Sequence, residues 1–135
     1  GTLSGNPLAV TAGLETLQMI RTIPDFYKIL EEKTKRLLGG WLDAAAEAGV
    51  AVQVHQSGSM FCLFFNDKPV LNYEDSCACD GKKFKTWFLS MLEQGIYLAP
   101  SPFETLFMSY AHSEDDLDRT ISAARIAMKE AAEAK

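Results

Sequence analysis

The chain has 135 residues, of which 47% are hydrophobic and 23% charged, and its formal net charge is −5. This composition suits one globular domain with a real core, so we do not expect global disorder. The basic residues form no dense patch and no apolar run approaches the roughly 20 residues that cross a bilayer, so we expect neither a nucleic-acid surface nor a membrane span.

The cysteines and the first residues bear on the compartment. An odd number of cysteines, Cys62, Cys77 and Cys79, argues against a disulfide scaffold and favours a reducing compartment. The chain opens on small and hydroxyl residues without a basic stretch, so we expect no secretory leader. Both points favour a cytoplasmic protein.

The first half of the chain predicts two helices. Asn6 before Pro7 is typical of a helix start, because Asn accepts a bond from a first-turn N–H and Pro loses none there. This helix should run to about Ile20. A second helix should open at Ile23–Asp25 and stop at Gly49. Its apolar stripe is Phe26, Leu30, Leu37, Leu38, Trp41, Leu42 and Ala45.

Two strands and a loop should follow. Val52–His55 alternates apolar and polar residues, which predicts a half-buried strand. Met60–Phe65 is continuously apolar and predicts a central strand covered on both faces. Residues 70–79 have no periodicity, so we expect a loop there.

The second half predicts two more helices separated by short strands. Asp80 should cap a helix that ends at Gly95, with Phe84, Trp87, Phe88, Met91 and Leu92 on its buried stripe. Ile96–Ala99 and Leu106–Tyr110 read as strands. Ser113 with an acid three residues later predicts a capping box at the start of the last helix. This order predicts an α+β fold, a small antiparallel or mixed sheet with helices on one face.

Catalytic and metal-binding patterns are weak. His55 and His112 lie far apart in sequence and neither accompanies a recognisable nucleophile, so local hydrogen bonding is the favoured interpretation for His112. Cys77 and Cys79 are one residue too close for the usual zinc spacing and no second ligand pair follows, so we expect no metal. Cys62 lies in an apolar strand and reads as core.

Two short segments stand out. Gly1–Pro7 combines small residues, hydroxyls and a helix start, a geometry that can bind an anion, although a flexible lead into the helix is the simpler interpretation. Ser101–Glu104 places an acid in a proline-rich loop between apolar segments. Such loops often carry function, and a solvated turn carboxylate is the alternative.

Four blocks of sequence resemble one family. They are Gly1–Ala9 (GTLSGNPLA), Pro69–Asp75 (PVLNYED), Gly95–Glu104 (GIYLAPSPFE) and Ser109–Ser113 (SYAHS). In order and spacing they are similar to blocks of the glutamate-1-semialdehyde aminomutases, which are class III aminotransferase-like, fold type I pyridoxal-phosphate enzymes. The resemblance spans Gly1 to about Ala127 and covers about the last third of such an enzyme.

The resemblance implies an activity for the intact protein. The family isomerises glutamate-1-semialdehyde to 5-aminolevulinate in tetrapyrrole biosynthesis, with pyridoxal phosphate (PLP) as the electron sink. The resemblance implies a homodimer in the bacterial cytoplasm. The family's Schiff-base lysine lies upstream of Gly1, so the chain alone should be inactive. Residues 1–22 would end the large domain, and residues 23–135 would form the small C-terminal α+β domain.

The resemblance also assigns site residues. Thr2, with Gly1 beside it, matches the threonine that reaches the PLP phosphate of the neighbouring subunit, and Glu104 matches an acid near the substrate. Pro102 replaces a common glutamine, which should stiffen the loop, and Cys77 and Cys79 also depart from the pattern. A free-standing, non-catalytic α+β binding or dimerisation module is the alternative function.

The resemblance has one structural consequence. The helix up to about Ile20 would have lost its packing partners. We therefore expect it either to be poorly ordered or to pack against another copy, because an exposed apolar stripe favours association.

Overall fold

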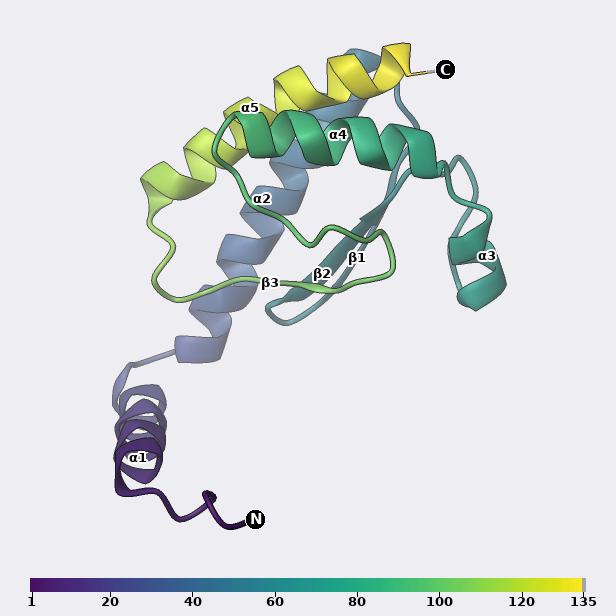
Figure 1. Cartoon of the computed structure of the whole chain (residues 1–135). Helices are drawn as coiled ribbons and strands as arrows, with labels where there is room; N and C mark the ends of the chain where they lie inside the picture. The colour runs from purple at the N-terminus through teal and green to yellow at the C-terminus, as the bar shows by residue number, and fades with distance from the viewer. Residues whose placement is uncertain (135) are drawn as a thin grey trace.

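The computed structural model describes residues 1–134 and confirms the predicted α+β class. Its elements are α1 (Pro7–Thr22), α2 (Phe26–Ala48), β1 (Gln53–Ser57), β2 (Met60–Phe64), α3 (Tyr73–Cys77), α4 (Gly81–Glu93), β3 (Leu106–Phe107) and α5 (Glu114–Glu133). The sheet is antiparallel in the order β1-β2-β3, and α2, α4 and α5 form the helical layer of the body (Figure 1).

The helix boundaries follow the polar residues that the sequence places before them. The Asn6 side chain accepts from the amides of Leu8 and Ala9, and that of Asp80 accepts from Lys82 and Lys83. Ser113 and Asp116 form the predicted capping box, with both reciprocal bonds present. These caps satisfy amides that have no partner inside the helix.

Two glycines end helices as predicted. Gly49 follows α2 with φ +68° and Gly95 follows α4 with φ +82°, and both lie in the left-handed region that only glycine adopts without strain. The entry to α2 differs, because Asp25 itself has φ +54° and its side chain makes no capping bond.

Three local predictions are wrong. Ile96–Ala99 is not a strand: the Ile96 amide donates to Met91 O at 2.9 Å and so closes helix α4 instead. The expected strand at Leu106–Tyr110 shrinks to Leu106–Phe107. Residues 70–79 are not all loop, because the Asn72 side chain caps the short helix α3 by accepting from the Asp75 amide at 2.9 Å.

The sheet is covered on one face. Phe61 and Leu63 of β2 point into the core and are 5% and 3% exposed. On the opposite face the paired residues Met60 and Phe107 remain 43% and 65% exposed. β2 is central, as predicted, but the expected burial on both faces is wrong.

Aromatic rings and a close helix crossing fill the core. The rings of Trp41 (α2) and Trp87 (α4) meet edge to face, with centroids 5.2 Å apart. Helix α5 packs against both α2 and α4. Where α2 crosses α5, a Cβ atom on Gly40 would lie 2.6 Å from Ile121 Cγ1, so only glycine permits this approach. Leu42 and Leu92 are each 41% exposed, so they lie at the edge of the apolar stripes predicted for α2 and α4 and not in the core.

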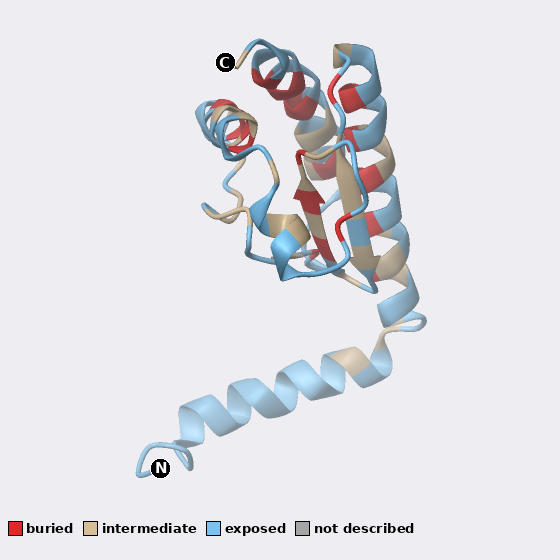
Figure 2. Ribbon diagram, turned by 90° about the vertical axis from the view of Figure 1, so that its right-hand side faces the viewer, coloured by how far each residue is buried: buried red, intermediate tan, exposed pale blue. Residues whose placement is uncertain are grey.

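Helix α1 stands apart from this body. Figure 2 shows it running away from the other elements, and it contains no buried residue. Leu8, Leu14 and Leu17 are 80%, 53% and 61% exposed. The structure forms α1 as one continuous helix, and its poor order or its packing against another copy both stay predictions. No helix among residues 1–134 is long and apolar enough to cross a membrane.

Candidate functional site

The N-terminal segment forms a compact turn ahead of α1. The Ser4 amide and hydroxyl both donate to Gly1 O, at 3.1 and 2.6 Å, and the Asn6 amide donates to Leu3 O at 3.1 Å. Thr2 is exposed at the middle of this turn. Within residues 1–134 its hydroxyl has no hydrogen-bond partner. A free hydroxyl beside backbone amides is a donor set that fits a phosphate oxygen.

Glu104 lies on a second turn, just before β3. Its amide donates to Ser101 O at 3.2 Å, and the Phe103 amide donates to Ser101 Oγ at 3.3 Å. The residue is exposed, and its carboxylate forms no ion pair with any residue in the described range. A negative charge is therefore presented outward on a turn held by its own hydrogen bonds.

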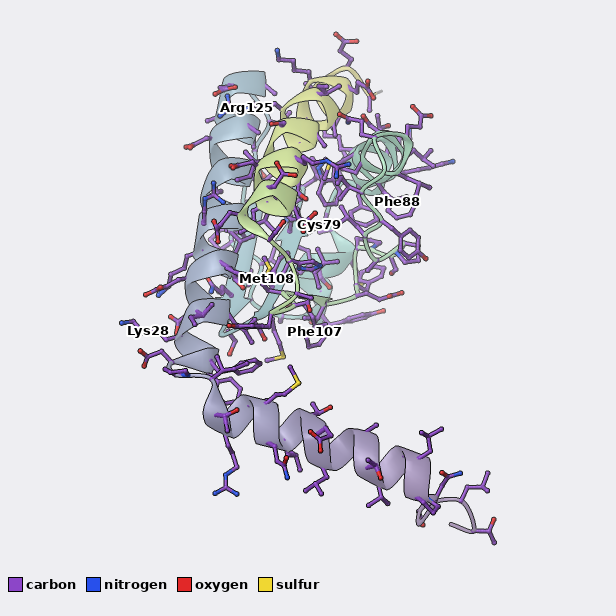
Figure 3. The ribbon with its side chains drawn as sticks, turned by 90° about the vertical axis from the view of Figure 1, so that its left-hand side faces the viewer. Lys28, Cys79, Phe88, Phe107, Met108 and Arg125 are labelled. Carbon is purple, nitrogen blue, oxygen red and sulfur yellow. The ribbon has the colours of Figure 1, made fainter. Side chains whose placement is uncertain are left out.

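The structure does not bring these two turns together. Thr2 lies at the far end of α1, whereas the Ser101–Glu104 turn belongs to the body (Figures 1 and 2). Figure 3 shows α1 leaving the body at the end where Lys28 and Phe107 lie. Within one copy of the chain, Thr2 and Glu104 cannot act on the same small molecule.

The two histidines lie in separate places. His55 lies on β1 with its ring 5.9 Å from that of Phe64. His112 Nδ1 accepts from the Ser109 amide at 3.2 Å, which confirms the local hydrogen bond predicted before the last helix.

The cysteines lie on different elements and none is in a disulfide. Cys62 is half-buried on β2, and this burial raises the pKa of its thiol. Cys77 is exposed at the end of α3, where its hydrogen bond to Tyr73 raises the pKa of the Tyr73 phenol. Cys79 Sγ lies 3.4 Å from Asp75 O. Within residues 1–134 no three side chains form a metal-binding group.

The sequence reasoning missed the neighbours of the Ser101–Glu104 turn. The ring of Tyr73 on α3 lies 6.3 Å from that of Phe103, so the short helix packs beside the turn. Beneath the turn, Trp87 lines a small cavity together with Ser101 and Glu104. The Asn72–Asp75 spacing was the available signal for α3, since Asn often caps a helix. No sequence signal indicated that Trp87 would line a cavity with this turn.

Comparison with solved structures defines the class of fold. An omega-transaminase from Sphaerobacter thermophilus matches 97% of this chain with a TM-score of 0.78 and 22% identity, over 30% of its own length. The PLP internal aldimine form of the Sphingopyxis sp. MTA144 FumI protein matches 87% of the chain with a TM-score of 0.67 and 25% identity, over 25% of its own length. The fold is that of one part of the transaminases.

Comparison of sequences narrows the class to one kind of enzyme. The glutamate-1-semialdehyde 2,1-aminomutase of Citrifermentans bemidjiense is 50% identical over 124 residues, which is 92% of this chain. That of Desulfosudis oleivorans is 48% identical over 125 residues, or 93% of the chain. Nearly the whole chain is thus similar to a segment of the glutamate-1-semialdehyde 2,1-aminomutases, as the four sequence blocks indicated. The chain spans 29% of the length of each relative, and no family model matches it.

Proposed function

We propose that this chain is the C-terminal part of a PLP-dependent aminomutase that converts glutamate-1-semialdehyde to 5-aminolevulinate in tetrapyrrole biosynthesis. The observation that carries the proposal is 50% identity over 92% of the chain to a protein of that name. The transaminase fold supports the proposal, because transaminases also move an amino group. The activity belongs to the longer protein, because the chain spans only 29% of its relatives.

Bound PLP would supply the electron sink for moving the amino group between adjacent carbons. Among residues of this chain, Thr2 is the candidate to hold its phosphate. The free hydroxyl of Thr2 and the neighbouring amides of the turn fit that anion, and Gly1 lies beside them in the same turn. We infer that the Schiff-base lysine lies on the part of the relatives' length outside this chain, so residues 1–135 alone are inactive.

Glu104 is the candidate acid on the substrate side. Its position on a hydrogen-bonded turn fixes the backbone while leaving the carboxylate exposed and unpaired within the described chain. A fixed negative charge there would orient the substrate's amino group and disfavour a second carboxylate.

We propose that the intact protein is a homodimer, in which Thr2 of one copy contributes to the site of the other. With Thr2 on the tip of α1 and Glu104 on the body, each would serve a site completed by another copy or by the rest of the protein. The exposed leucines of α1 supply apolar area for such packing. We place the protein in the bacterial cytoplasm, which the three free thiols and the bacterial relatives support.

The decisive experiment measures 5-aminolevulinate formation from glutamate-1-semialdehyde by the longer protein and by residues 1–135 alone. We expect turnover by the longer protein only. Absence of turnover in the PLP-loaded longer protein would refute the proposed activity. Turnover by residues 1–135 unaided would refute the assignment of the electron-sink machinery to another segment.

Two matched pairs of variants test the residues. Thr2→Val should weaken PLP binding, whereas Thr16→Val should not, because Thr16 bonds only to Ala12 O of its own helix. Glu104→Gln should lower turnover in correctly folded protein, whereas Glu93→Gln at the end of α4 should not. Equal behaviour within either pair would remove that residue from the site.

A further inference from the structure

The connection between α4 and β3 contains a strand-like segment without a partner strand. Ile96 and Leu98 are partly buried and pack against the core, whereas Tyr97 between them is 75% exposed. Alternation of inward and outward side chains is the pattern of an extended chain. The Ile96 amide is used to close α4 by donating to Met91 O. Among residues 1–134, no backbone group bonds to the amides or carbonyls of residues 97–99.

The neighbouring strand β3 does not pair with this segment. β3 bonds to β2, and the sheet of the described chain ends there, in the order β1-β2-β3. Residues 96–98 and 106–108 together line one cavity of about 140 Å³, whose walls are mostly apolar side chains. Figure 1 shows the segment leaving α4 and continuing to the turn before β3. The two runs are therefore neighbours that share a cavity but no hydrogen bond.

The same stretch of chain exposes aromatic rings. Tyr97, Phe103 and Phe107 are 75%, 58% and 65% exposed, and Tyr97 and Phe107 line the same cavity. Single exposed apolar side chains are ordinary, whereas several on one stretch are typical of an interaction surface. The chain spans 29% of the length of the relatives that it matches, so most of the longer protein is available to cover these rings.

Covering this surface removes water from the backbone of residues 97–99. Peptide groups that lose their water almost always have hydrogen-bond partners in the protein. A segment that pairs as a strand supplies these partners and covers the apolar side chains at the same time. A segment of the same polypeptide also binds at a high effective concentration, which favours it over a second copy of the chain.

We propose that a strand of the longer protein, from outside residues 1–135, pairs with the backbone of Ile96–Ala99. The inference rests on the proposed function only in that the chain is part of a longer protein. In a strand, the peptide groups of alternate residues point to opposite edges. Because the Ile96 amide is already bonded at the end of α4, the free edge is that of Tyr97 and Ala99, whose amides and carbonyls form the new ladder.

Amide hydrogen exchange tests the pairing without measuring activity. In residues 1–135 alone, residues 97–99 should exchange at nearly the rate of an unbonded chain, while β2 stays protected. In the longer protein, their exchange should be slower by roughly tenfold or more. Equal exchange in the two proteins overturns the proposal. Protection that appears in residues 1–135 alone as their concentration rises assigns the partner to a second copy and also overturns it.

Two substitutions of Tyr97 separate its backbone from its side chain. Tyr97→Pro removes the amide hydrogen, and Tyr97→Ala keeps it while removing the ring. In the longer protein, we expect Tyr97→Pro alone to raise the exchange of residues 98 and 99 to the level seen in residues 1–135. Both substitutions should leave the urea midpoint of residues 1–135 nearly unchanged, because there the amide is unbonded and the ring exposed. Retained protection in Tyr97→Pro overturns the ladder.

A crystal structure of the longer protein tests the pairing directly, whether or not Tyr97→Pro folds. We expect a carbonyl oxygen from outside residues 1–135 at about 3 Å from the amide nitrogen of Tyr97 or Ala99. An ordered segment whose amides contact only water or side chains overturns the proposal. None of these measurements depends on turnover, so a failure of the proposed aminomutase activity is distinguishable from a failure of the strand pairing.

Discussion

Replacing Gly40 by alanine tests the closest helix crossing in the body. The new Cβ would lie 2.6, 2.7 and 2.8 Å from the Cγ1, Cγ2 and Cδ1 atoms of Ile121, all shorter than carbon atoms tolerate. Gly39, the preceding residue in the same helix, has open space where its Cβ would go. The two substitutions therefore make the same chemical change with and without a collision.

The expected magnitudes follow from two opposing effects. Alanine in place of glycine inside a helix gains about 1 kcal/mol, which Gly39→Ala should show as added stability. Gly40→Ala makes the same gain but forces α2 and α5 apart, and such overpacking costs about 1–3 kcal/mol. We expect Gly40→Ala to be about 1–3 kcal/mol less stable than Gly39→Ala.

Urea denaturation followed by tryptophan fluorescence measures this difference, since Trp41 and Trp87 both lie in the core. Ile121→Ala removes the colliding atoms, so in that background Gly40→Ala should no longer destabilise the protein. Equal midpoints for Gly39→Ala and Gly40→Ala in the native background would refute the close crossing of α2 and α5.

Three further predictions concern separate parts of the chain. Ser113→Ala should destabilise the protein by about 1 kcal/mol near neutral pH by removing the cap of α5. Separately, the hydrogen bond from the Ser113 hydroxyl lowers the pKa of Asp116, so the stability that this bond adds is present above the unfolded pKa of Asp116 and is lost as the pH falls through its folded pKa. The stability of Ser113→Ala should therefore depend less on pH in acid, and unchanged acid sensitivity would contradict the capping box. The exposed thiol of Cys77 should react with iodoacetamide faster than that of Cys62, whose burial raises its pKa; mass spectrometry of the modified peptides gives the order, and the reverse order would contradict the burial of Cys62. In the longer protein, Thr2→Val should weaken PLP binding by about 1–3 kcal/mol, measured by dialysis against decreasing PLP, and unchanged retention would remove Thr2 from the phosphate site.

Local sequence signals predicted the helices well. Asn6, Asp80 and Ser113 each cap the helix expected, and Gly49 and Gly95 end theirs, because caps and left-handed glycines depend on a few neighbouring residues. These signals act within one turn of helix and therefore survive any change in tertiary packing.

The strands were predicted less well because sheet formation depends on distant partners. Ile96–Ala99 is apolar enough for a strand, but its first amide is already used to close α4. Leu106–Phe107 pairs with Phe61 and Met60 for only two residues, a length that no local pattern encodes. Hydrophobic periodicity and composition could not indicate which apolar segment would pair with the edge strand of the sheet.

The candidate site was predicted only through likeness to a family. Nothing in the composition near Thr2 or Glu104 distinguishes a phosphate site from a capped turn, or a functional acid from a solvated one. The cavity lined by Trp87 and by the Ser101–Glu104 turn joins segments that no periodicity relates. It required the fold, because the cavity exists only where α4 and the turn meet.

The direction of α1 depends on the short connection between α1 and α2, residues 23–25. Helix α1 has 16 residues, so at 1.5 Å per residue its axis extends about 24 Å beyond Thr22. A rotation of about 10° near Pro24 and Asp25 would therefore carry Thr2 through roughly 4 Å, more than the length of one hydrogen bond. Any function that needs Thr2 at a fixed position therefore requires contacts to α1 from outside this chain, because no residue of α1 is buried against the body.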